Sequence, residues 1–415
     1  MPDLTDVVII GGGVLGAALA WELSRRTVRV ALLEAHALGG GTTGRSFAWI
    51  NATAKHEDET YHRLNARGLA CYDDLAAEWS AERIGLHGGG SLFWAGGADE
   101  AGRERLRQRA VRLQGWGYPV ALLNAAEMQT LEPQANFASP EREGAEGLFA
   151  PADKWLETPR LIRFFTEQTR ERNGDIREYC PATGFTRGLI MAISTVETPE
   201  GRIATGRLVL TAGAQTPALL AQITGNPTDA ARFAVRPVPG LLVETPPGSA
   251  PEQAQRVLYP PDAGGLHLRP TPGGGLLLGA DDADALISES REVRGDTHPA
   301  ASTLRESAPR EANFVFPPEV PAALLRRAAQ ALPNLPVEAL MGSLAARVCV
   351  RPVPADGLPI VGEIPGLKGV YMAVTHSGIT LGPLLARLLA EEMVIGRPSP
   401  LLAPYRPERF LRESR

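Results

Sequence analysis

The glycine-rich segment at 11–16, with the sequence Gly-Gly-Gly-Val-Leu-Gly, constrains the fold more than any other part of this chain. It follows a short, apolar, β-branched run at 6–10, which is typical of a buried parallel strand, and it opens a helical pattern. In such a unit Gly11 makes the tight turn, Gly13 lets the backbone approach a pyrophosphate, and Gly16 lets the helix pack on the strand. The amide groups at the start of the helix would face the phosphate anion. The segment therefore predicts a dinucleotide-binding turn.

A carboxylate at the expected distance supports this interpretation. A second apolar strand pattern at 28–33 ends at Glu34, about twenty residues after the turn, where an acid accepts hydrogen bonds from the adenosine ribose. The glycines could alternatively serve only to pack a strand–helix corner. The complete order of strand, turn, helix, strand and acid favours a dinucleotide-binding turn over a packing corner. It does not distinguish FAD from NAD.

Length and charge narrow the class of protein. A chain of 415 residues is long for one core and predicts two domains, which can be interleaved. The 42 basic and 47 acidic side chains leave a net charge of −5, with neither sign gathered into long runs. This pattern argues against a nucleic-acid partner and against binding to an anionic membrane surface.

The cysteines and the N-terminus bear on the compartment. Cys71, Cys180 and Cys349 are far apart in the sequence and lack the spacing of metal ligands, so free thiols and no metal site are expected. The N-terminus has no basic region ahead of its first apolar run, which argues against a signal peptide. The stretch at 7–23 contains four glycines and ends in charged residues, so a buried strand–turn–helix fits better than a membrane span. We expect a cytoplasmic protein with no integral membrane segment.

The remaining pattern alternates helices with buried strands. Helical periodicity covers roughly 60–82, 99–115 and 158–172, and a buried strand at 370–374 precedes a helix at 384–394. Residues of roughly 226–345 are rich in proline and glycine and contain short strand patterns. An α/β fold is expected, in which a nucleotide-binding domain is built from separated pieces around a mainly β insert.

Three further segments carry a resemblance to a known family. The strand-to-turn segment at 207–214, Arg-Leu-Val-Leu-Thr-Ala-Gly-Ala, resembles the second FAD motif of flavoproteins. The segments at 351–362 and 375–383 are similar to the C-terminal stretch of the D-amino-acid oxidase superfamily, which includes glycine oxidase, monomeric sarcosine oxidase and D-amino-acid dehydrogenase. The resemblance implies FAD as the cofactor and a Rossmann-like FAD domain interleaved with an antiparallel-sheet substrate domain. The boundaries expected are 1–90, 145–225 and 340–415 for the FAD domain, and 91–144 and 226–339 for the substrate domain.

The resemblance also implies which residues contact the cofactor. Residues of the loop at 42–46 would lie along the pyrophosphate and isoalloxazine, Ala182 would meet the adenine, and the helix start at 378–381 would point its amides at the flavin N1–C2=O edge. A positive helix end there would stabilise the anionic reduced flavin. The expected cofactor-binding residues are Gly11, Gly13, Val14, Leu15, Gly16, Glu34, Ala35, Thr42, Thr43, Arg45, Ser46, Ala182, Thr211, Ala212, Gly213, Cys349, Gly378, Ile379, Thr380 and Leu381.

Arg351 is the expected substrate-binding residue, because it matches the arginine of the glycine-oxidase Arg-Pro motif that grips the substrate carboxylate. A planar, bidentate donor suits that task better than lysine. The alternative is a buried arginine paired with Asp356 or a backbone carbonyl. Arg269 is a second candidate from the insert. His376 lies at the flavin end, where it could act as a base, hydrogen-bond the flavin edge or only pack.

Cys349 falls where monomeric sarcosine oxidase attaches FAD covalently. Two roles are open for it: a small buried thiol beside a non-covalent FAD, or a covalent link to the flavin. The other attachment position of the family is a histidine, and Arg45 occupies it here, so histidyl attachment is excluded.

The resemblance implies oxidation of the C–N bond of an amino acid or secondary amine by hydride transfer to FAD, with electrons passing on to O2 or to an electron carrier. Two alternatives remain at this point. One is a 2-hydroxy-acid dehydrogenase or oxidase on the same fold, which needs a base for the hydroxyl proton. The other is a non-catalytic FAD-binding subunit.

Overall fold

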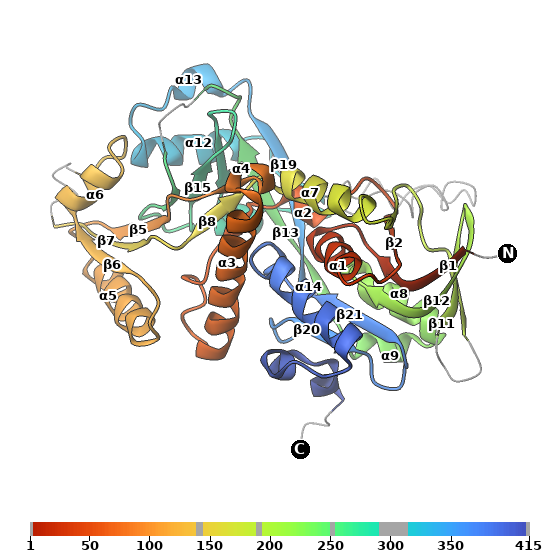
Figure 1. Cartoon of the computed structure of the whole chain (residues 1–415). Helices are drawn as coiled ribbons and strands as arrows, with labels where there is room; N and C mark the ends of the chain where they lie inside the picture. The colour runs from red at the N-terminus through yellow and green to blue at the C-terminus, as the bar shows by residue number, and fades with distance from the viewer. Residues whose placement is uncertain (1–2, 138–143, 188–192, 250–253, 290–313, 412–415) are drawn as a thin grey trace.

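The computed structural model describes residues 3–137, 144–187, 193–249, 254–289 and 314–411, and these form two main sheets beside one another (Figure 1). The first sheet contains the glycine-rich turn and has a parallel centre. The second is mainly antiparallel. The α/β class and the interleaving of the two parts along the chain are confirmed.

The first sheet has the order β10-β11-β12-β1-β2-β9, and β21 pairs with β12 and with β20. The neighbours β9, β2, β1, β12 and β21 run parallel. Their apolar sequences follow from burial on both faces. The strands are β1 (Asp3–Ile10), β2 (Val30–Leu33), β9 (Asp175–Arg177), β10 (Gly184–Arg187), β11 (Ile193–Thr198), β12 (Gly201–Leu210), β20 (Ile360–Glu363) and β21 (Val370–Val374).

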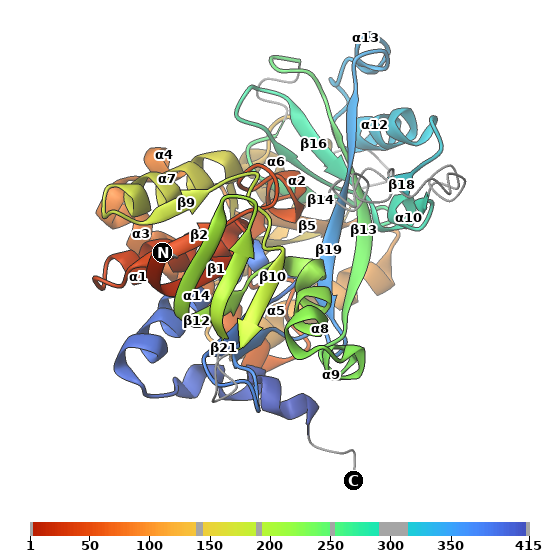
Figure 2. The same cartoon turned by 90° about the vertical axis from the view of Figure 1, so that its right-hand side faces the viewer.

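Alternate residues of β1 enter two different cores, because successive side chains of a strand point to opposite faces. Val7 and Ile9 pack with α1 (Val14–Ser24), α3 (Glu59–Trp79), α7 (Thr158–Arg170) and α14 (Gly378–Ile395). Val8 and Ile10 pack with α8 (Thr216–Thr224) on the other side. Figure 2 shows β2, β1 and β12 side by side between these layers.

The second sheet has the order β19-β13-β16-β15-β14-β5-β7-β6. All its pairs are antiparallel except β14 with β5. Helix α12 (Val320–Ala331) packs Leu324 and Leu325 into a core with its strands. The strands are β5 (Ser91–Ala95), β6 (Ala121–Asn124), β7 (Glu146–Ala150), β13 (Val235–Glu244), β14 (Val257–Tyr259), β15 (His267–Pro270), β16 (Leu276–Gly279) and β19 (Ala345–Pro354).

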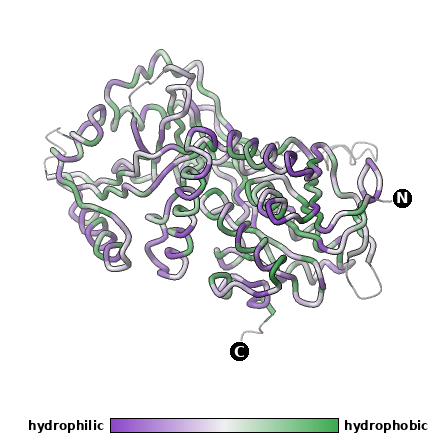
Figure 3. The backbone as a smooth tube through the Cα atoms, viewed as in Figure 1, coloured by the Kyte–Doolittle hydropathy of each residue, from purple (hydrophilic) through white to green (hydrophobic). Residues whose placement is uncertain are grey.

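The remaining elements are short or lie at the edges. Helix α5 (Glu100–Gly115) mixes purple and green turns in Figure 3, as expected of a helix with one exposed and one buried face. A small third sheet consists of β3 (Trp49–Ile50), β8 (Lys154–Leu156) and β4 (Leu86–His87). A separate pair is formed by β17 (Ser288–Glu289) and β18 (Phe314–Val315). The other helices are α2 (Thr42–Arg45), α4 (Ala81–Ile84), α6 (Ala125–Leu131), α9 (Pro227–Ala231), α10 (Asp281–Asp284) and α13 (Val337–Leu340), with 3-10 turns at Gly213–Gln215, Pro400–Tyr405 and Pro407–Phe410.

Two strands lie in a different sheet from the one that the sequence-based boundaries imply. β7 and β19 were expected in the FAD domain, but both belong to the second sheet. β19 pairs with β13 over its whole length, from Pro354 opposite Val235 to Ala345 opposite Glu244. A strand pattern does not reveal its hydrogen-bond partner, which is why the boundaries missed this. We propose that 146–150 and 345–354 belong with the substrate domain. Residues 290–313 of the insert lie outside the described residues.

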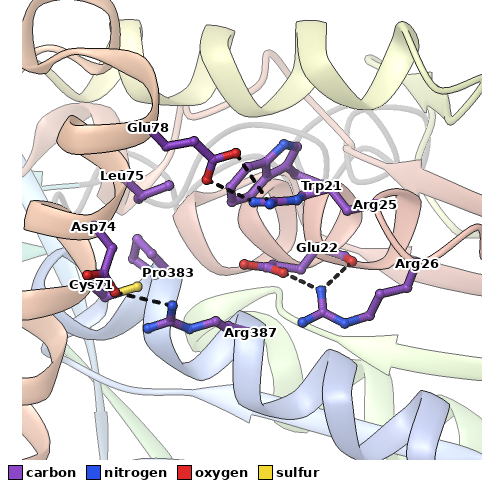
Figure 4. Close-up of a pocket in the computed structure, with 10 residues that line it drawn as sticks. All are labelled: Trp21, Glu22, Arg25, Arg26, Cys71, Asp74, Leu75, Glu78, Pro383 and Arg387. Atoms are coloured by element: carbon purple, nitrogen blue, oxygen red, sulfur yellow. Dashed lines mark hydrogen bonds and ion pairs between the residues drawn. The ribbon is translucent and has the colours of Figure 1, made fainter.

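A shallow hollow of about 400 Å³ lies where α1, α3 and α14 meet (Figure 4). Three ion pairs cross or border it: Arg25 with Glu78, Arg26 with Glu22, and Arg387 with Asp74. Its charges balance, so the hollow has no excess of either sign to attract a charged ligand. The pair Arg25–Glu78 ties the end of α1 to α3, and Arg387–Asp74 ties α14 to α3, on the face opposite α8.

Candidate active site

A cavity of about 1000 Å³ is lined by residues of both main sheets. Of the site residues expected from the sequence, only Gly16, Leu381 and Arg269 do not line it. Those that do are Gly11, Gly13, Val14, Leu15, Glu34, Ala35, Thr42, Thr43, Arg45, Ser46, Ala182, Thr211, Ala212, Gly213, Cys349, Arg351, His376, Gly378, Ile379 and Thr380.

The glycine-rich turn is compact because two of its glycines contact main chain directly. Gly11 has a φ of +108°, and a Cβ there would lie 2.7 Å from the carbonyl oxygen of Thr211. A Cβ on Gly16 would lie 1.9 Å from the carbonyl oxygen of Gly11. Gly16 therefore sets how closely α1 packs on β1, although it does not itself line the cavity.

Glu34 ends β2 with its carboxylate beside the turn. It accepts hydrogen bonds from the amide of Gly12 at 2.7 Å and from the amide of His36 at 2.9 Å. The main chain of Glu34 is held by Arg177 and Cys180. The carboxylate is thus fixed at the mouth of the turn, with Ala182 also on the cavity wall.

The short helix α2 connects the turn to β19. The hydroxyl of Thr43 accepts a hydrogen bond from the amide of Val14 at 3.1 Å, and the hydroxyl of Thr42 donates to the carbonyl of Val350 at 2.6 Å. The thiol of Cys349, which is buried, donates to the carbonyl of Thr42 at 3.6 Å. The bonds of Thr42 place α2 and β19 side by side on the same wall of the cavity.

The geometry fits FAD as an extended ligand. The turn, Glu34 and the N-terminus of α14 all line the cavity, and a Cβ on Gly378 would lie 3.6 Å from the side chain of Val14 in the turn. A Cβ on Gly41 would meet nothing within 4 Å, so open space lies beside α2. On Gly13 a Cβ would lie 3.1 Å from the hydroxyl oxygen of Thr43, so a side chain would crowd the place where a pyrophosphate approaches. We infer that these residues would hold the nucleotide half, and 378–380 the flavin half.

Arg351 projects from β19 into the cavity. Its Nη2 donates to a carboxylate oxygen of Asp284 at 2.8 Å and to the carbonyl of Pro239 at 3.2 Å. The side chain is 41% exposed, so part of the guanidinium faces open space. Burial raises the pKa of Asp284, while the nearby Arg351 acts in the opposite direction. Arg351 lines the cavity, and its acid partner is Asp284, whereas the expected partner Asp356 pairs with Arg409 instead.

Arg269 takes a structural position instead. Its Nε donates to the carbonyl of Phe47 at 2.5 Å and its Nη1 to the carbonyl of Pro270 at 2.8 Å. The guanidinium lies 4.7 Å from the ring centre of Trp155, and burial lowers its pKa to about 9. Because it is 6% exposed and does not line the cavity, we leave it out of the proposed substrate site.

His376 lies just before α14 with its Nε2 3.4 Å from the ammonium nitrogen of Lys55. Burial, then Lys55 and Arg351, lowers the pKa of His376 to about 4. The imidazole is therefore neutral at physiological pH. The hydroxyl of Tyr61 donates to Ser377 at 2.8 Å and that of Tyr72 donates to the carbonyl of Ile379 at 2.6 Å, which positions the start of α14.

Aromatic rings form one wall of the cavity. Tyr259 lies 5.1 Å from Trp49 and 5.3 Å from His267, and Phe93 stacks behind Tyr259 at 4.4 Å, centre to centre. Trp49, Tyr259 and His267 line the cavity. The wall would exclude water from a substrate beside it.

The sequence missed three charged residues of the cavity, Lys55, Asp281 and Asp284. None lies in a motif. Lys55 is in a loop after β3, and the two acids begin and end the short α10. Only the folding of the insert against β19 brings Asp284 to Arg351. Tyr61 and Tyr72 fall within the helical periodicity at 60–82, which does not reveal that their hydroxyl groups bond to the start of α14.

The described residues contain neither a cluster of metal ligands nor a membrane-spanning helix. No group of three or more histidine, cysteine, aspartate or glutamate side chains is arranged to hold a metal ion in this part of the chain. Within the same residues, every helix is too short or too polar to cross a membrane.

Comparisons with known proteins agree with this geometry. The family model described as FAD dependent oxidoreductase matches residues 6–392. Glycine oxidase of Geobacillus kaustophilus is 27% identical over 395 residues, covering 93% of this chain and 92% of the relative. Its crystal structure superposes with a TM-score of 0.73 at 24% identity over 97% and 98% of the two chains. L-proline dehydrogenase from P. horikoshii superposes with a TM-score of 0.76 at 21% identity over 99% of each chain. The chain therefore belongs to the D-amino-acid oxidase family of FAD-dependent oxidoreductases.

Proposed function

We propose that this FAD-dependent oxidoreductase oxidises the C–N bond of a small amine that carries a carboxylate, such as an amino acid or a secondary amine derived from one. The observation that supports this most is Arg351, which lines the cavity and is close enough to His376 to lower the pKa of that imidazole. Its planar fork suits a carboxylate. Two similar proteins, glycine oxidase and L-proline dehydrogenase, take their names from amino acids, which are amines that carry a carboxylate.

The chain's own residues would orient and enclose the substrate. Arg351 would hold the carboxylate, and Asp284 keeps the guanidinium in place through its ion pair. Trp49 and Tyr259 would cover the substrate and exclude water. FAD, when bound, would supply the acceptor for the hydride that leaves the substrate α-carbon. Orientation and exclusion of water are thus the main contributions of the protein.

The low pKa of His376 favours an amine over a 2-hydroxy acid as substrate. A hydroxy acid must lose a hydroxyl proton, and a good general base has a pKa near the operating pH. A histidine with a pKa of about 4 is a weak base, and a neutral amine needs no base of this kind. No observation favours the hydroxy-acid alternative.

Replacement of His376 by alanine is therefore expected to reduce kcat/KM modestly, by about 10-fold or less, below the 10²–10⁴-fold that general bases typically contribute. The measurement is steady-state kinetics with the best amine, with flavin content checked for each variant. Loss of all activity in a variant that keeps its flavin would instead indicate that His376 is an essential base.

The proposal itself is tested by anaerobic bleaching of the yellow protein. Amino acids, N-methyl amines and 2-hydroxy acids are added in turn, and flavin absorbance is followed. We expect carboxylate-bearing amines to bleach the flavin and hydroxy acids not to. If nothing in the panel bleaches it, a non-catalytic FAD-binding role becomes the better account.

Cys349 permits a separate prediction about the cofactor. Its thiol is buried and hydrogen-bonded to the carbonyl of Thr42, as a structural thiol would be. We therefore expect acid precipitation to release all the flavin into the supernatant. A pellet that stays yellow, and loses that colour in the Cys349→Ala variant, would instead establish a covalent link.

A further inference from the structure

Lys55 brings a charged group into the cavity that the proposed chemistry does not use. It lies in the loop after β3 and lines the cavity together with Asn51, His376 and Arg351. Its Nζ is 3.4 Å from Nε2 of His376 and 5.6 Å from the ring centre of Tyr61. The side chain is only partly exposed. The ammonium is thus held among an imidazole, a phenol ring and the cavity.

No carboxylate in the described part of the chain forms an ion pair with Lys55. Burial alone lowers its pKa to about 8, and no acid acts in the opposite direction. A buried charge without a partner is costly, and proteins usually pair it or use it. Because this pKa leaves most of the group protonated at neutral pH, the cavity has an uncompensated positive charge at this point.

Arg351 is a second cation close to His376. Both Lys55 and Arg351 lower the pKa of that histidine. The two cations differ in their surroundings. Arg351 is paired with Asp284, whereas Lys55 has a neutral imidazole as its hydrogen-bonding neighbour. One carboxylate on Arg351 would leave Lys55 uncompensated. A ligand with a second anionic group would meet both charges.

We propose that Lys55 binds a second carboxylate of the substrate, so that the enzyme acts on amines with two carboxylates, such as dicarboxylic amino acids or N-carboxyalkyl amino acids. The proposal rests on the proposed function for the first carboxylate and for the amine. The lysine ammonium suits the second carboxylate because it is a point charge on a flexible stem, which tolerates variation in the distance between the two acid groups.

The test measures ligand binding apart from turnover. Succinate and glutarate are titrated into the oxidised holoenzyme, with acetate and propionate as single-carboxylate probes, and the shift of the flavin absorbance gives each Kd. We expect the dicarboxylates to bind about 10-fold or more tightly than the monocarboxylates, which is the effect of one charge-assisted hydrogen bond. Equal affinities in the unaltered protein would overturn the proposal.

Variants locate the effect at Lys55. Lys55→Gln should remove the preference for dicarboxylates, and Lys55→Arg should keep it. Lys368→Gln, which removes an exposed lysine in the turn before β21, is the matched control and should leave the preference unchanged. The proposal fails if Lys55→Gln weakens both classes of ligand equally, or if it changes the flavin potential and not the preference. Lys55→Arg also keeps the test valid if the glutamine variant does not fold.

Failure of this inference can be told from failure of the proposed function. If glycine and proline bleach the flavin as well as aspartate and glutamate do, the amine chemistry stands and the second carboxylate site is wrong. If no amine bleaches it but dicarboxylates still bind through Lys55, the binding site stands and the amine chemistry is wrong.

Discussion

A Gly16→Ala variant should retain little or no FAD after purification. The new Cβ would lie 1.9 Å from the carbonyl oxygen of Gly11 and 2.7 Å from the hydroxyl oxygen of Thr211. The first of these is a backbone atom of the turn, so relief requires α1 to move away from β1. Overpacking of this kind costs about 1–3 kcal/mol or more, and it displaces the amide groups that would face the pyrophosphate. The ratio of flavin to protein absorbance and the Tm measure both effects.

Gly115→Ala is the matched control, because it makes the same chemical change at a helix end where a Cβ meets nothing within 4 Å. It should retain FAD fully and leave the Tm unchanged or slightly raised, since alanine favours helix over glycine. Should Gly16→Ala bind flavin as well as this control does, the close packing of α1 on the turn would not be needed for cofactor binding.

Arg351→Lys should lower kcat/KM for the best amine by roughly 100-fold, while the protein keeps its flavin. Lysine preserves the charge beside Asp284 but loses the planar fork that a carboxylate needs. Loss of a charged hydrogen bond that the bound substrate would enclose costs about 2–5 kcal/mol. Because the interaction is with substrate, the Kd for a competing carboxylate should rise as well. Steady-state kinetics and ligand titration measure these two quantities.

Arg347→Lys is the matched control on the same strand. Its Nη1 pairs with Glu244 at 2.6 Å, and it is not among the residues lining the cavity. Its kcat/KM should stay within about 3-fold of the unaltered protein, as for a partly exposed ion pair. Equal losses in the two variants would mean that β19 is merely strained by lysine, and that Arg351 has no special contact with substrate.

The nucleotide end of the cavity could be predicted because its information is local. A strand, three glycines at fixed spacing and an acid at the end of the next strand occupy one βαβ unit at 3–34, and the geometry of the unit brings Glu34 to the turn. Arg351 was predicted to lie in the cavity from its family motif, and it does. The roles of these residues toward FAD and substrate stay predictions.

The substrate end depends on contacts between distant segments. Arg269 and Arg351 both lie on strands in similar sequence surroundings, yet Arg269 is enclosed by Phe47 and Trp155 while Arg351 faces the cavity. Burial of a side chain depends on what packs over it, and the covering residues lie more than 100 positions away in the chain. No periodicity in the sequence contains that information.

The sequence by itself therefore determined the cofactor-binding unit and the family, because backbone conformation and short spacings are properties of neighbouring residues. Only the tertiary structure decided that β19 joins the second sheet, that Asp284 pairs with Arg351 and that Lys55 has no acid partner among the described residues. These facts depend on long-range packing and on the local dielectric environment, which arise only when the two sheets close around the cavity.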